Sequence, residues 1–114
     1  MLSRCQRILV LALHDERPVE RLRELVAKAS DSLDDEERAA LLGVDPDGLR
    51  MTSLLVRKLR FERLVSGDPE LRAACERDPR GVTESFVRYA RAVPPTSSFP
   101  AEEAAAFRRF RAGE

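Results

Sequence analysis

Apolar residues recur at intervals of three and four along most of the chain, which is the spacing of one face of an α-helix. Residues 18–29 show the pattern most clearly, with Leu22, Leu25, Val26 and Ala29 on one expected face. No segment alternates apolar and polar residues over several positions between hairpin turns, so a β-sheet is not expected. The pattern therefore predicts an all-α fold, a compact bundle of about six or seven short helices.

Capping residues divide this helical pattern into segments. In Asp45-Pro46 and Asp68-Pro69, aspartate is expected to cap a helix and proline to take its first position. Asp78-Pro79 is interpreted as a turn, because Arg-Gly follows it, with Thr83 capping the next helix. Ser32 is expected to cap an earlier helix that begins with a run of acidic residues.

The longest predicted helix covers residues 46–66. Its apolar residues occupy more than one stripe, which indicates a central helix surrounded by others. They are Leu49, Leu55, Val56, Leu59, Leu64 and Val65.

Composition limits the class of protein. A length of 114 residues favours a single helical domain over 1–114, and 35% charged with 43% hydrophobic residues is a globular balance. The net charge is +0, from 20 basic and 20 acidic residues, which argues against a protein that mainly neutralises phosphates. The longest apolar run, residues 8–13, is too short to span a bilayer. We expect a cytoplasmic protein that does not bind membranes.

Candidate catalytic and metal-binding residues are few. His14 is the only histidine and is interpreted as a helix C-terminal residue, because no further metal ligands stand at helical spacing from it. Cys5 and Cys75 belong to no metal or redox motif and are expected to be buried free thiols. The sequence contains no phosphate-binding glycine motif. These observations argue against an enzyme acting alone and against a metal or cofactor held by this chain.

The strongest basic cluster is RKLRFER, residues 57–63. Arg57, Lys58 and Arg60, together with Phe61, could form a nucleic-acid recognition helix. The preceding GVDPDG is acidic and longer than the tight turn of a helix-turn-helix motif. A salt-bridged helix surface or a protein interface is therefore favoured, and a nucleic-acid-binding module is kept as an alternative.

Residues 88–100, RYARAVPPTSSFP, interrupt the helical pattern with a double proline and three hydroxyl residues. The composition is typical of a connector that is stiff at Pro94 and Pro95 and flexible afterwards. Phe99 is expected to pack onto the last helix beside Phe107 or Phe110. The stretch then acts as a turn that fixes the final helix.

The wider segment 84–110, ESFVRYARAVPPTSSFPAEEAAAFRRF, combines an aromatic-rich helix, a Pro-Pro-x-Ser turn and an aromatic-led final helix. In this combination it resembles the small partner subunits of multinuclear non-haem iron oxidative enzymes that modify ribosomally made peptides, the methanobactin-type and bufferin-type accessory proteins. The resemblance covers the C-terminal third of the chain and, less closely, residues 54–65. Part of that family has been described as a DNA-binding domain, which also keeps the nucleic-acid alternative open.

The resemblance implies a non-catalytic subunit of a peptide-modifying complex. It would bind an iron-dependent oxidase as a heterodimer and help to recognise the precursor peptide in RiPP maturation, with iron held by the enzyme. An oligomerising adaptor is a further alternative. The implied partner-binding residues are the aromatic residues and prolines around the turn, with nearby arginines that could reach acidic groups on the enzyme or peptide: Phe86, Tyr89, Pro94, Pro95, Phe99, Phe107, Phe110, Arg57, Arg60, Arg88 and Arg91.

Overall fold

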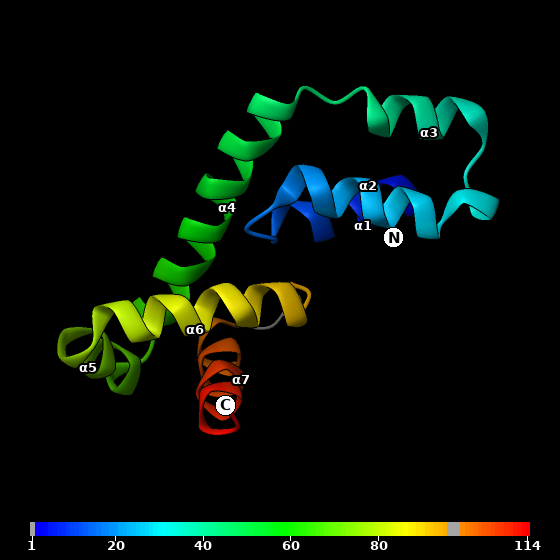
Figure 1. Ribbon diagram of the computed structural model, residues 1–114. Helices are drawn as coiled ribbons and strands as arrows, with labels where there is room; N and C mark the ends of the chain where they lie inside the picture. Colours follow the sequence, from blue (N-terminus) through cyan, green and yellow to red (C-terminus); the bar gives the residue numbers. More distant parts are fainter. Residues whose placement is uncertain (1, 96–98) are drawn as a thin grey trace. The chain divides into compact units, whose positions relative to one another are not determined.

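The computed structural model describes residues 2–95 and 99–114 and folds them into seven α-helices and one short 3-10 helix, with no strand in these ranges (Figure 1). This confirms the prediction of an all-α fold with six or seven helices. None of the described helices has the length and apolarity that crossing a bilayer requires. The elements are α1 (Arg4–Leu13), α2 (Pro18–Lys28), η1 (Ser30–Ser32), α3 (Asp35–Leu42), α4 (Pro46–Ser66), α5 (Pro69–Arg77), α6 (Pro79–Ala92) and α7 (Pro100–Ala112).

The chain divides into two compact units, Met1–Val56 and Arg57–Glu114, and the division falls within α4. Each unit has its own cluster of buried apolar side chains. We refer to them as the first and the second unit. That both form a single domain, as the length suggests, stays a prediction.

In the first unit α1 and α2 lie side by side and α3 packs against them (Figure 1). Ser53 of α4 is fully buried, and its hydroxyl donates to the carbonyl oxygens of Leu13 at 2.7 Å and Asp15 at 3.1 Å, which ties α4 to the end of α1. His14 is the C-cap of α1, as predicted. The buried apolar residues of this unit are Ile8, Ala12, Val19, Leu22, Val26, Leu33, Leu41 and Leu49.

In the second unit the end of α4 packs with α5, α6 and α7 around a core rich in aromatic residues. Arg108 of α7 pairs with Asp68 at 2.9 Å and with Glu70 at 2.9 Å, so α7 is tied to the start of α5 at the edge of this core. The buried apolar residues are Leu64, Leu71, Val82, Phe86, Tyr89, Ala90, Ala104 and Phe107.

Each of the three Asp-Pro dipeptides marks the start of a helix, with proline as the first residue of α4, α5 and α6. The Asp45 carboxylate accepts from the backbone N–H of Gly48 at 2.8 Å, which confirms the predicted cap of α4. Asp68 stands at the N-cap position of α5, but its side chain makes no capping bond and pairs with Arg108 instead.

Asp78-Pro79 was predicted to form a turn, and this was wrong. Asp78 caps α6, and its carboxylate accepts from the backbone N–H of Gly81 at 3.1 Å. A Cβ atom at Gly81 would collide with that carboxylate, so the glycine makes room for the cap and does not end the helix. Thr83 lies inside α6 and donates to the carbonyl oxygen of Pro79.

The predicted cap Ser32 is also corrected by the structure. Ser32 lies in the 3-10 helix, and Asp34 caps α3 through a capping box. Its carboxylate accepts from the Glu37 backbone N–H at 2.7 Å, while the Glu37 side chain accepts from the Asp34 N–H at 3.0 Å. The reciprocal pair satisfies two backbone donors, which a lone serine cap cannot do.

Candidate partner-binding site

The aromatic side chains of the resembling segment divide into a core set and an exposed one. The Phe86 ring meets Phe61 edge-on at 5.0 Å between centroids and Phe107 at 5.7 Å, and Tyr89 lies 5.1 Å from Phe107 and 5.5 Å from Phe110. Edge-to-face pairs at these distances are favourable beyond the area that they bury. Phe86, Tyr89 and Phe107 are buried, so any effect that they have on a partner acts through the shape of the second unit and not through contact.

Arg60 lies inside the second unit and not on a basic surface. Its Nε donates to Glu103 Oε1 at 3.1 Å, and one terminal nitrogen donates to Glu103 Oε2 at 2.8 Å and to the Val93 carbonyl at 3.0 Å. The guanidinium also lies over the Tyr89 ring, 5.3 Å from its centroid. Burial, and then the nearby Glu103 carboxylate, raise the pKa of Tyr89, because each disfavours a phenolate. Arg60 thus joins α4, the end of α6 and α7.

Arg60 donates hydrogen bonds to residues on both sides of the proline-rich stretch. Val93 comes directly before Pro94, and Glu103 lies in the first turn of α7. Pro94 is exposed and Pro95 half-buried; the expected Thr-Ser-Ser connector, residues 96–98, lies outside the described residues. Phe99 is 75% exposed. The expectation that Phe99 packs beside Phe107 or Phe110 was therefore wrong, and its ring is presented on the surface at the start of α7.

The predicted arginines have different surroundings. Arg57 is half-buried, and Arg88 and Arg91 are exposed on α6. Arg88 Nε donates to the side chain of Glu114 at 2.8 Å, and the hydroxyl of Ser85 donates to the same carboxylate at 2.8 Å. The hydrogen bond from Arg88 has the largest effect on the pKa of the Glu114 carboxyl, and the bond from Ser85 adds to it. Together they hold this pKa below its usual value of 4.5.

The lowered pKa gives a testable pH dependence. The contribution of this contact to folding is fully present above the ordinary glutamate pKa, and it is lost as the pH falls through the lowered one. We expect the Glu114 carboxyl carbon, followed by NMR, to titrate below 4.5. Arg88→Gln should raise the midpoint, whereas Arg91→Gln on the same helix should leave it unchanged. Equal midpoints in the wild type and in Arg88→Gln would show that the contact does not form in solution.

An exposed apolar surface on α4 was not predicted. In the first unit Leu49 and Ser53 face the interior, but Met51, Leu54 and Leu55 are 74, 63 and 58% exposed. These three, at positions i, i+3 and i+4, lie on one face of the helix, and we call them the α4 stripe. The interpretation of α4 as surrounded on more than one side was therefore wrong. The sequence does show that α4 has apolar residues on more than one face. The spacing of these residues does not show which face packs against other helices.

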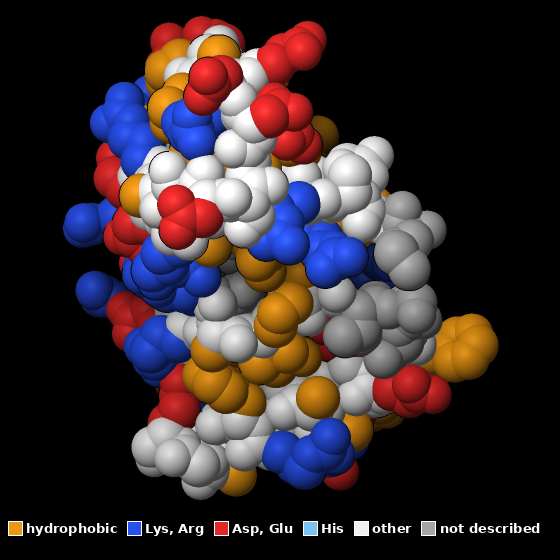
Figure 2. Space-filling model, turned by 90° about the vertical axis from the view of Figure 1, so that its right-hand side faces the viewer, with side chains coloured by type: hydrophobic (Ala, Val, Ile, Leu, Met, Phe, Trp, Pro, Cys, Tyr) orange, Lys and Arg blue, Asp and Glu red, His pale blue; other side chains and the backbone are white. Residues whose placement is uncertain are grey.

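The basic cluster of residues 57–63 does not present a continuous cationic surface. Arg60 is bound to Glu103, and Lys58 lies 3.8 Å from Glu62 one turn along. Figure 2 shows acidic and basic side chains interspersed over the face that it displays. Such a mixture gives weak attraction for a polyanion.

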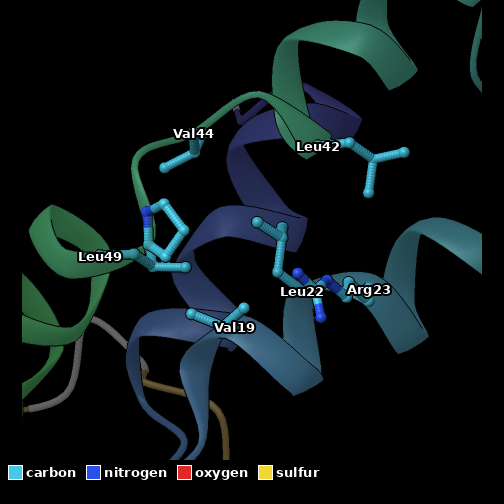
Figure 3. Close-up of a pocket in the computed structure, with 7 residues that line it drawn as sticks. Val19, Leu22, Arg23, Leu42, Val44 and Leu49 are labelled. Atoms are coloured by element: carbon cyan, nitrogen blue, oxygen red, sulfur yellow. The ribbon is translucent and has the colours of Figure 1, made fainter.

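The cavities found among the described residues of the first unit are lined mainly by aliphatic side chains, each with one charged residue, Arg23 or Asp45. One pocket has a volume of about 30 Å³, room for a water molecule or two. Figure 3 shows its lining, in which Val19 and Leu22 of α2 lie opposite Val44 and Leu49, and Arg23 and Leu42 are also drawn. A groove of about 260 Å³ lies beside it. The groove is lined by Leu9, Leu13, Val44, Asp45, Gly48, Leu49 and Thr52.

The two thiols are free and only partly buried, which corrects the expectation that they are buried. Burial raises the pKa of Cys75, and burial together with Glu37 raises that of Cys5, whose Sγ lies 3.4 Å from a Glu37 oxygen. A raised pKa lowers the fraction of reactive thiolate at neutral pH. In the described part of the chain no group of three or more His, Cys, Asp or Glu side chains is placed to hold a metal ion.

The second unit therefore exposes Phe99 at the start of α7 and, on α6, Arg88 and Arg91, and the first unit exposes the α4 stripe. Aromatic, aliphatic and arginine side chains such as these are the usual anchors of contacts with a protein or peptide. Comparison with known family models, with curated proteins and with solved structures gives no match for this chain.

Proposed function

We propose that this chain is a non-catalytic partner subunit, which binds a multinuclear non-haem iron oxidase and helps to recognise that enzyme's ribosomally synthesised precursor peptide. The proposal combines the resemblance of residues 84–110 with the surfaces described above. The α4 stripe is the observation that carries it.

The α4 stripe supports a protein partner because its exposure is concentrated on one helix face. Single exposed leucines are common on protein surfaces, but neighbouring ones on one face form a contiguous apolar patch, which marks an interaction site. Arg50 pairs with Asp47 one turn before the stripe, which gives the patch a polar border. An apolar centre with a polar border is the usual composition of a protein interface.

A groove of the second unit supports peptide recognition. It has a volume of about 410 Å³ and lies between the end of α4 and the start of α7, next in sequence to the exposed Phe99. Its lining combines apolar side chains, Leu59 and Pro100, with charged ones, Glu62 and Arg63, which suits a peptide that carries both kinds of side chain. It is lined by Leu59, Glu62, Arg63, Ser66, Gly67 and Pro100.

The α4 stripe also favours a second candidate, the oligomerising adaptor. Two copies of the chain could cover the same apolar side chains by pairing their α4 helices. Sedimentation over a range of concentrations separates the candidates, because the adaptor associates without any enzyme present, whereas the partner subunit stays monomeric until the oxidase is added.

The partner role is tested by co-expression with a multinuclear non-haem iron oxidase of the peptide-modifying class, followed by size-exclusion chromatography. We expect the two to co-elute and Leu55→Glu to weaken the complex by about tenfold or more, as for a central interface residue. Leu42→Glu is the matched control, because Leu42 of α3 is an exposed leucine of the same unit outside the stripe. Failure to co-elute, with full peptide modification by the enzyme alone, would exclude the proposal.

A further inference from the structure

Four polar side chains converge where α6 meets the end of the chain. Ser85 and Arg88 lie on α6, one turn apart, and Arg111 lies in the last turn of α7. The side chain of Glu114 reaches between them and accepts from Ser85 at 2.8 Å and from Arg88 at 2.8 Å. The positive charge of Arg111 also lowers the pKa of this carboxyl group. The carboxylate thus accepts one charge-assisted hydrogen bond from Arg88 and one from a buried hydroxyl, and Arg111 is held beside them by its own bond to Ser85.

The orientation of the Ser85 hydroxyl follows from its partners. Ser85 is 2% exposed, and its oxygen accepts from Arg111 Nε at 3.2 Å and from a terminal nitrogen of Arg88 at 3.4 Å. A serine oxygen has two lone pairs and one proton. Both lone pairs face arginine donors, and the proton points to Glu114 Oε2. An acceptor at that position therefore satisfies the buried hydroxyl.

We propose that Ser85, Arg88 and Arg111 form a carboxylate-binding site for an acidic side chain of a peptide, and that Glu114 fills this site in cis. We call it the Ser85 site. The inference goes beyond the proposed function, because it depends only on contacts inside the second unit and holds whether or not an iron oxidase is the partner. In the peptide-bound state a glutamate or aspartate of the ligand replaces the Glu114 carboxylate and accepts from the same two donors, the Ser85 hydroxyl and Arg88 Nε.

The donors around the site fit a carboxylate. The two oxygens of Glu114 accept from the Ser85 hydroxyl and from Arg88 Nε, so one carboxylate satisfies both of these donors. A phosphate group presents three acceptor oxygens, more than the two donors that the Glu114 carboxylate meets here. Glu84, next to Ser85 on α6, is paired with Arg80 at 3.1 Å.

Competition between Glu114 and a peptide provides the test. Glu114 is tethered close to the site and competes at a high effective concentration, so removing its charge should increase the affinity for a dissolved acidic peptide. The probe is the capped tripeptide acetyl-Ala-Gly-Glu-amide, titrated by NMR into the 114-residue chain while the Nε–H signals of Arg88 and Arg111 are followed. If Glu114 occupies the site about nine-tenths of the time, Glu114→Gln should bind the probe about tenfold more tightly than the wild type does.

Two controls make the result decisive. The probe acetyl-Ala-Gly-Gln-amide should leave the arginine signals unmoved, since a neutral amide gains no charge-assisted hydrogen bond. Arg88→Gln combined with Glu114→Gln should lose the added affinity, and Arg88 is exposed, so the fold tolerates the change. Equal binding by the wild type and Glu114→Gln, no binding by either, or tighter binding of a phosphoserine analogue than of the glutamate probe would each overturn the proposal.

Discussion

Replacing Arg60 by alanine is expected to lower the free energy of unfolding of the second unit by about 3–5 kcal/mol. The substitution leaves the Glu103 carboxylate partly buried without its bidentate partner and removes the donor to the Val93 carbonyl. A folded unit is stable by only roughly 0.05–0.15 kcal/mol per residue, so a loss of this size consumes most of the stability of the second unit. Urea unfolding followed by the amide signals of residues 57–95 measures the effect.

Two further variants separate the buried ion pair from a general effect of losing an arginine. Arg50→Ala removes an exposed pair with Asp47 and should change the free energy of unfolding by less than about 1 kcal/mol. Arg60→Met combined with Glu103→Leu removes both charges and should recover much of the stability, since an apolar pair can replace a buried ion pair. If Arg60→Ala costs no more than Arg50→Ala, the Arg60 contacts do not stabilise the second unit.

The fold could be predicted from the sequence because its helices are specified locally. Helical spacing of apolar residues, aspartate caps and proline at first positions all act within a few residues of each other, so the seven helices follow from short segments. The error at Asp78 has the same local origin. A glycine at position 81 was interpreted as a helix breaker, whereas its missing Cβ leaves space for the capping carboxylate.

The candidate site could be predicted only in part, because its contacts join distant segments. Arg60 and Glu103 are 43 positions apart, and Ser85 and Glu114 are 29 apart. No short pattern shows that RKLRFER sends one arginine inward, or that a serine of α6 faces the end of the chain. The α4 stripe shows the same limit, because apolar spacing identifies a helix face but not whether another element covers it.

Phe99 and Phe107 of residues 84–110 allow effects on stability to be distinguished from effects on binding, because one is exposed and the other is buried. Phe107→Ala should cost about 3–5 kcal/mol, because Phe107 is fully buried and its ring packs against Phe86 and Tyr89. Phe99→Ala removes the same atoms from an exposed position and should change the stability by less than about 0.5 kcal/mol. Urea unfolding of both variants measures this difference.

Phe99→Ala also tests whether the exposed ring of Phe99 contributes to binding. An exposed aromatic side chain adds little to the stability of the unit that carries it, so its expected effect lies in binding. Phe99→Ala should therefore keep the fold and lose co-elution with the oxidase or with its precursor peptide. If Phe99→Ala unfolds the second unit, the ring belongs to the core in solution. If it changes neither stability nor co-elution, Phe99 is not part of the partner-binding surface.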